Sequence, residues 1–117
     1  MTTLDSHLDR VSSAIREAFN AIAEIVDKLG PHRIAPLKTM IVFSTTSNFA
    51  SVTLTKTRLD LAFFLPEVRH HSRVRRIVPL GPRKFAHYTQ IFGAHDVDSE
   101  LAEWLRQSYR VSVRSAD

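Results

Sequence analysis

Residues 49–65, FASVTLTKTRLDLAFFL, carry the clearest strand pattern in this chain. In residues 49–56 apolar side chains alternate with Ser and Thr, and in residues 59–65 every second position is Leu or Phe. A period of two places alternate side chains on opposite faces of a β-strand. Only Thr57 and Arg58 separate the two runs, which is short enough for a hairpin turn. The stretch therefore predicts two neighbouring antiparallel strands that share an apolar face.

Further strand-like runs lie on both sides of this hairpin. Before it come residues 32–35 and 40–45, with Pro36 between them marking a bend or a sheet edge. After it come residues 74–80 and 84–92, separated by a Gly-Pro turn. Because strands joined by tight connections pair antiparallel, we expect one antiparallel sheet of five or six strands.

Helical patterns occur only at the two ends of the chain. From Leu4 to Leu29 apolar residues recur at steps of three and four, which predicts a long N-terminal helix of roughly 25 residues, ended by Gly30. A C-terminal helix with an apolar stripe is expected after Asp96 or Asp98, either of which can cap it. Helices at the ends of a run of strands indicate the α+β class, with both helices packed on one sheet face. No internal repeat or linker is evident, so residues 1–117 are predicted to form a single domain.

The composition excludes several classes of protein. With 117 residues, 44% of them hydrophobic, the chain is long enough to bury a core without disulfides or metals. The absence of cysteine excludes a disulfide framework, thiolate zinc sites and a cysteine nucleophile. No apolar run approaches the roughly 20 residues that cross a bilayer, so no membrane association is expected. The N-terminal residues do not show the pattern of a secretory signal, and a cytoplasmic location is the expectation.

The second face of the predicted sheet is not cleanly polar. Phe64 lies on it beside Ala62, and the strand of residues 84–92 places Tyr88 and Phe92 opposite its other apolar residues. A sheet with one solvated face normally alternates more regularly. Three explanations are open: the sheet curls on itself, a second copy of the chain covers the face in a homodimer, or a ligand covers it.

Positive charge is concentrated in one stretch of the chain. Between Glu67 and Tyr88 there are six basic residues and one acidic residue, whereas the rest of the chain has ten basic and eleven acidic residues. The basic residues of this stretch are Arg69, Arg73, Arg75, Arg76, Arg83 and Lys84. Such a field attracts polyanions, so a nucleic-acid-binding patch over residues 69–84 is one interpretation. The other is a solvated loop whose arginines pair with carboxylates elsewhere.

Short motifs spread from Gly30 to Tyr109 resemble one known family. They include PLKT followed by IVF, FASV, LDL with FFLP, a pair of arginines, GPR, FAH, and the EL and WL pairs of the last helix. In order and spacing they are similar to an uncharacterised bacterial family, the domain of unknown function catalogued as DUF5655. The resemblance implies a small α/β domain that occurs alone or as a module, and it assigns no catalytic residue.

Five residues are candidates for ligand binding, and none is a candidate for catalysis. Lys38 follows a proline in a bend, and together with arginines and His87 it could hold a phosphate or a carboxylate. For His87 the alternative is a hydrogen-bonded core histidine. The candidates are Lys38, Arg75, Arg76, Arg83 and His87.

Catalytic and metal motifs are missing from the sequence. There is no glycine-rich phosphate loop, no nucleophile elbow and no obvious pair of carboxylates. His70-His71 lacks a third ligand at the usual spacing, so neither a metal nor another cofactor is expected. The sequence therefore favours a small non-enzymatic binding module for an anionic ligand or partner. The alternatives are a nucleic-acid-binding protein and a homodimerising structural subunit.

Overall fold

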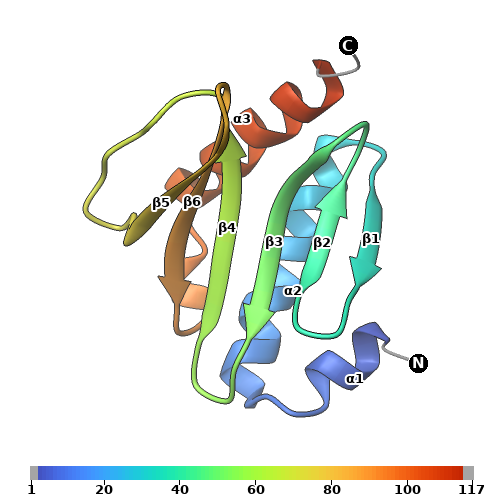
Figure 1. Cartoon of the computed structure of the whole chain (residues 1–117). Coiled ribbons are helices and arrows are strands. Elements are labelled where there is room, and N and C mark those ends of the chain that lie inside the picture. The colour runs from blue at the N-terminus through green and yellow to red at the C-terminus, as the bar shows by residue number, and fades with distance from the viewer. Residues whose placement is uncertain (1–2, 115–117) are drawn as a thin grey trace.

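A computed structural model describes residues 3–114 as one antiparallel sheet with two long helices on one of its faces (Figure 1). The α+β prediction is confirmed, and the sheet has six strands. No helix in the described range is long and apolar enough to cross a membrane. The elements are α1 (Leu4–Leu8), α2 (Ser13–Leu29), β1 (Arg33–Pro36), β2 (Ile41–Ser44), β3 (Asn48–Leu54), β4 (Leu59–Leu65), β5 (Arg76–Gly81), β6 (Lys84–Ile91), a short 3-10 helix η1 (Ala94–Asp96) and α3 (Ser99–Arg114).

The hairpin of residues 49–65 forms the middle of the sheet as predicted. Its strands β3 and β4 pair antiparallel, with Ala50 opposite Phe63 and Leu54 opposite Leu59. The strand order is β1-β2-β3-β4-β6-β5, so β6 rather than β5 lies beside β4. The connection of residues 66–75 carries the chain past the place of β6 to the sheet edge, where β5 begins.

The predicted N-terminal helix is broken in two, and here the prediction of a single helix was wrong. α1 ends at Leu8, and α2 starts at Ser13 after Ser12, whose hydroxyl accepts a hydrogen bond from the Ile15 N–H. This cap satisfies one of the free N–H groups at the start of a helix, which makes a new start favourable there. Leu8, Val11 and Ile15 are spaced as in one helix because both segments turn apolar residues toward the same core.

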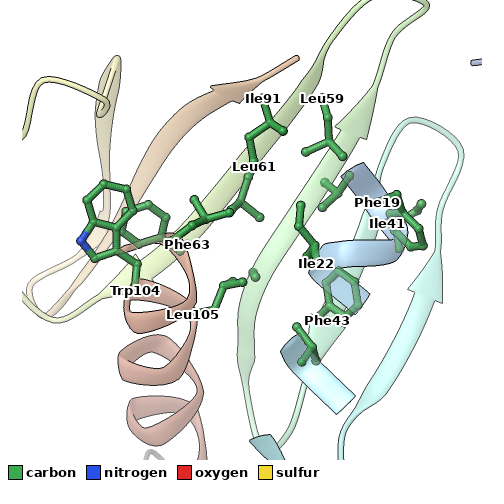
Figure 2. Close-up of a cluster of buried hydrophobic side chains, with 14 of the residues drawn as sticks. Phe19, Ile22, Ile41, Phe43, Leu59, Leu61, Phe63, Ile91, Trp104 and Leu105 are labelled. Atoms are coloured by element: carbon green, nitrogen blue, oxygen red, sulfur yellow. The ribbon is translucent and has the colours of Figure 1, made fainter. Parts of the chain in front are cut away.

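The core lies between the helices and one face of the sheet. Five residues of α2 and three apolar residues of α3 are buried against alternate residues of β2, β3, β4 and β6. Figure 2 shows Phe63 and Trp104 at one side of this cluster, and Phe19 and Phe43 beside α2 at the other. Burying one such side chain stabilises a fold by about 1.5–3 kcal/mol. This packing fixes the helices on the sheet.

The opposite face of the sheet carries no helix and remains open (Figure 1). β1 and β5 are the two edges and do not pair with each other, so the sheet does not curl into a barrel. Phe64, Ala62 and Tyr88 lie on this face, as the alternation predicts. That a second copy of the chain or a ligand covers this face stays a prediction.

Gly30 provides the sharp end of α2. Its φ is +140°, and a β-carbon added there would lie 2.5 Å from Tyr109 Oη, which donates a hydrogen bond to the Pro31 carbonyl. At Gly81 an added β-carbon has no atom within 4 Å. The two glycines therefore form a matched pair for substitution.

We expect Gly30→Ala to lower the free energy of unfolding by about 1–3 kcal/mol, because alanine is strained at this φ and displaces Tyr109. Gly81→Ala should change it by less than about 0.5 kcal/mol. Urea unfolding monitored by circular dichroism measures both values. Equal effects of the two substitutions would contradict this account of the helix end.

Candidate functional site

The structure does not bring the five sequence-predicted ligand residues together. Lys38 lies in the turn between β1 and β2, while Arg75 and Arg76 lie at the start of β5, the opposite edge strand. Four inter-strand spacings separate β2 from β5, which is about 20 Å. Arg83 lies in the β5–β6 turn, at the other end of the sheet from Lys38. A single site containing Lys38 and the arginines is therefore not formed.

His87 is completely buried on the helix-facing side of β6. Its Nδ1–H donates to the Phe85 carbonyl at 3.0 Å, and its Nε2 accepts from the Arg69 N–H at 2.9 Å. Both ring nitrogens are used, which defines one neutral tautomer. Desolvation by burial lowers the pKa of His87 and outweighs the hydrogen bonds to backbone carbonyls that would raise it. In this geometry His87 holds the chain after β4 in place and presents no free nitrogen to a ligand.

The connection of residues 66–75, which we call the basic loop, is attached to α3 rather than solvated throughout. Arg73 donates to Asp98 at 2.9 Å, to Glu100 at 3.3 Å and to the Asp96 carbonyl at 2.6 Å. Partial burial opposes the charge of Arg73, but the two carboxylates outweigh it and raise the pKa of this guanidinium. Arg69 donates to Gln107 at 2.8 Å. Part of the predicted basic patch is therefore neutralised by α3.

The remaining arginines of the patch stay exposed. Arg75, Arg76 and Arg83 form no ion pair with any residue in the described range 3–114. The Arg76 guanidinium lies over the ring of Tyr88, 4.3 Å from its centroid. The part of the stretch that can act on a partner is thus smaller than the sequence indicates, and it is confined to β5 and its two ends.

Lys38 belongs to a different cluster of positive charge, in a pocket of about 700 Å³ at the end of the sheet below α1. The pocket is formed where α1 and the segment between α1 and α2 meet the β1–β2 and β3–β4 turns. We call it the α1 pocket. Its lining residues are Ser6, His7, Arg10, Val11, Lys38, Thr39, Leu54, Thr55 and Lys56. Four of these nine carry a basic side chain and none is a carboxylate.

Local structure explains why these side chains meet. The His7 imidazole donates from Nε2 to the Leu37 carbonyl, which ties α1 to the β1–β2 turn. The Thr55 N–H donates to the Arg58 carbonyl at 2.8 Å and closes the β3–β4 turn, which exposes Lys56. The break at Ser12 lets α1 fold across this end of the sheet. Sequence reasoning did not find His7, Arg10 or Lys56, because a continuous helix would have carried the first two away from Lys38.

Comparison with known proteins identifies the family. The family model described as a domain of unknown function, DUF5655, matches residues 4–112. The chain belongs to the DUF5655 family. No curated protein and no solved structure matches it. The resemblance seen in the sequence is confirmed, and the match extends over both helical segments as well as the sheet.

In the described part of this DUF5655 domain, no group of three or more His, Cys, Asp or Glu residues is placed to hold a metal ion. His71 instead lies 2.8 Å from Glu100, with its ring edge-on to Trp104. The α1 pocket instead brings His7, Arg10, Lys38 and Lys56 together around a concave surface.

The buried His87 predicts a specific pH dependence of stability. Because its pKa is lowered in the folded state, the unfolded chain takes up the proton first as the pH falls. The contribution of neutral His87 to the free energy of unfolding is therefore complete above the unfolded pKa of about 6.5 and is lost as the pH falls below it. At pH 7.5, His87→Leu should lower the free energy of unfolding by about 1–3 kcal/mol, because it leaves the Arg69 N–H without an acceptor.

Urea unfolding of wild type and His87→Leu at two pH values tests this. We expect the difference between them to shrink from pH 7.5 to about pH 5.5. His95→Gln is the control, because the His95 side chain is 78% exposed. A difference that stays constant with pH would show that the charge state of His87 does not matter for folding.

Proposed function

We propose that this DUF5655 domain is a small, non-enzymatic binding module for an anionic small molecule that binds in the α1 pocket. The observation that carries the proposal is the meeting of His7, Arg10, Lys38 and Lys56 around one cavity with no carboxylate in its lining. Basic groups held together without counter-charges attract anions strongly. A cytoplasmic location remains part of this proposal.

The donors of the pocket suit a ligand with more than one negative group. Arg10 offers a planar fork for bidentate contact with a phosphate or carboxylate, and the two lysines add point charges. Thr39 adds a hydroxyl donor at the rim, whereas the hydroxyls of Ser6 and Thr55 already donate to the Thr3 and Arg58 carbonyls. Because Arg10, Lys38 and Lys56 are exposed, the free pocket retains hydrated cations at little cost.

The size of the pocket and its apolar residues favour a small molecule over a single inorganic ion. A volume of about 700 Å³ is in the range of small-molecule sites, about 300–1,000 Å³. Val11 and Leu54 supply apolar surface next to the cations. A phosphorylated or polycarboxylate compound with a non-polar portion fits this combination.

A binding role is favoured over catalysis by the same residues. His7 supplies the one imidazole of the lining, and its Nε2 is occupied by the hydrogen bond to the Leu37 carbonyl. Without a carboxylate in the lining, His7 has no partner for acid–base catalysis there. The pocket therefore supports recognition of charge rather than proton transfer.

We expect pyrophosphate or citrate to bind the wild-type protein at low ionic strength, and Arg10→Gln or Lys38→Gln to weaken binding. Each substitution should remove about 1 kcal/mol, which is about fivefold in Kd, because solvent exposure reduces the strength of each charge contact. The double variant should lose at least about tenfold. Isothermal titration calorimetry gives the affinities, and amide NMR shifts locate the site.

Lys28→Gln is the matched control, since Lys28 is exposed near the end of α2 and does not line the α1 pocket. Preference for pyrophosphate or for citrate decides between a phosphate and a carboxylate ligand. The proposal would be refuted if neither pyrophosphate nor citrate bound. It would also be refuted if Lys28→Gln weakened binding as much as Arg10→Gln or Lys38→Gln.

A further inference from the structure

The open face of the sheet contains a second group of residues that the α1 pocket does not use. Phe64 of β4 is paired with Ala86 of β6, and Ala62 is paired with Tyr88. Phe64 and Tyr88 are therefore diagonal neighbours on adjacent strands of one face, close enough for their rings to form a joint surface. Both side chains are partly exposed, and no helix lies above them.

Small side chains lie between and beside the two rings. Ala62 and Ala86 occupy the positions across from Tyr88 and Phe64, and Ser51 of β3 is paired with Ala62. None of these residues projects far from the backbone. Ala62 and Ala86 are themselves buried, so the surface available to a ligand here is formed by the partly exposed rings of Phe64 and Tyr88 and the cations beside them.

Cations already lie on the faces of both rings. The Arg76 guanidinium is 4.3 Å from the Tyr88 centroid, and Lys84 Nζ is 5.1 Å from the Phe64 centroid. The Arg76 guanidinium covers this face of Tyr88, so a base that stacks there takes its place and leaves Arg76 to contact a phosphate. Nucleic-acid bases stack on aromatic rings and on arginine planes in the same way.

The charge at this edge of the sheet is positive and unpaired. Arg76 and Lys84 lie on the open face, and Arg75 and Arg83 flank β5 at its two ends. None of the four forms an ion pair in the described range 3–114. Asp60 is on the same face, but it is held by Arg58 at 2.8 Å and 3.2 Å. Phosphates would therefore meet cations with no free carboxylate beside them.

We infer that the open face over β4, β5 and β6 binds single-stranded nucleic acid, with bases stacked at Phe64 and Tyr88 and the phosphates held by Arg75, Arg76, Arg83 and Lys84. The aromatic pair distinguishes this from a simple basic patch. In a duplex the bases are stacked within the helix and inaccessible to the two rings, so a single strand is the better occupant.

A second copy of the chain fits this face less well. In a two-fold dimer the same patch meets itself, so the positive edge of one subunit would approach that of the other. Burying these cations together costs free energy unless carboxylates pair with them, and Asp60 is already engaged. Charge complementarity thus selects a polyanion over self-association.

The test is fluorescence anisotropy with a labelled oligothymidylate of roughly 12 nucleotides and with a duplex of the same length. We expect tighter binding of the single strand and a steep loss of affinity between about 50 and 200 mM salt. Tyr88→Leu with Phe64→Leu should weaken binding at least about tenfold, while keeping apolar bulk on the sheet. Arg76→Gln should weaken binding and reduce the salt slope by about 0.7.

Two controls separate this surface from other sources of positive charge. Arg110→Gln changes an exposed arginine of α3, on the covered side of the sheet, and Lys38→Gln changes the α1 pocket. Both should leave oligonucleotide binding unchanged. If the double aromatic variant does not fold, the single Tyr88→Leu and Arg76→Gln variants decide the question on their own.

Five results would overturn the inference. Four come from the binding experiments: no binding at low salt, equal or tighter binding of the duplex, insensitivity to the aromatic substitutions, and losses in the controls as large as in Arg76→Gln. A fifth is a dimer, measured by sedimentation, that Phe64→Leu converts to a monomer, since the face would then belong to a second copy of the chain.

Discussion

The contact on which most of this structure depends is the stacking of Phe63 with His87 and Trp104. The ring centroids are 5.2 Å and 4.9 Å apart, and the ring planes are nearly parallel in both pairs. The stack joins β4 to β6 and to α3, so it fixes the last helix on the sheet. It also forms the surface on which the basic loop rests, because Arg69 bonds to His87 and Arg73 lies over Trp104. The stack therefore decides where β5 begins, and with it where the free arginines of the open face stand.

Much of the fold follows from local patterns in the sequence. All six strands and the final helix lie where alternation and helical spacing place them, because each pattern is confined to a few neighbouring residues. The break before Ser12 was not predictable from periodicity, since the apolar spacing from Leu8 to Ile15 continues across it. The hydroxyl of Ser12 is the signal that could have indicated it, because serine is favoured at the start of a helix.

The candidate sites were harder to predict, because they combine residues far apart in the chain. His87 accepts a hydrogen bond from the Arg69 N–H, and Arg69 lies 18 residues earlier in a loop without regular structure. Lys38 was singled out from its own turn, yet its neighbours in the α1 pocket come from α1 and the β3–β4 turn. Arg73 belongs to the basic stretch by sequence but is paired with α3. Composition locates charge along the chain, whereas tertiary packing decides which charges remain available.

The two cationic regions lie at opposite corners of one rigid sheet, and this separation has a functional consequence. The α1 pocket depends on the position of a five-residue helix tied by His7 to the Leu37 carbonyl, whereas the open face is built on paired central and edge strands. A short helix with few buried residues opens at lower free energy than strands of the sheet. An anion in the pocket would bridge α1 to the two turns and stabilise the least stable part of the domain. Binding at the open face would add contacts to an already fixed surface, so the two proposed sites differ in how much order their ligands would have to supply.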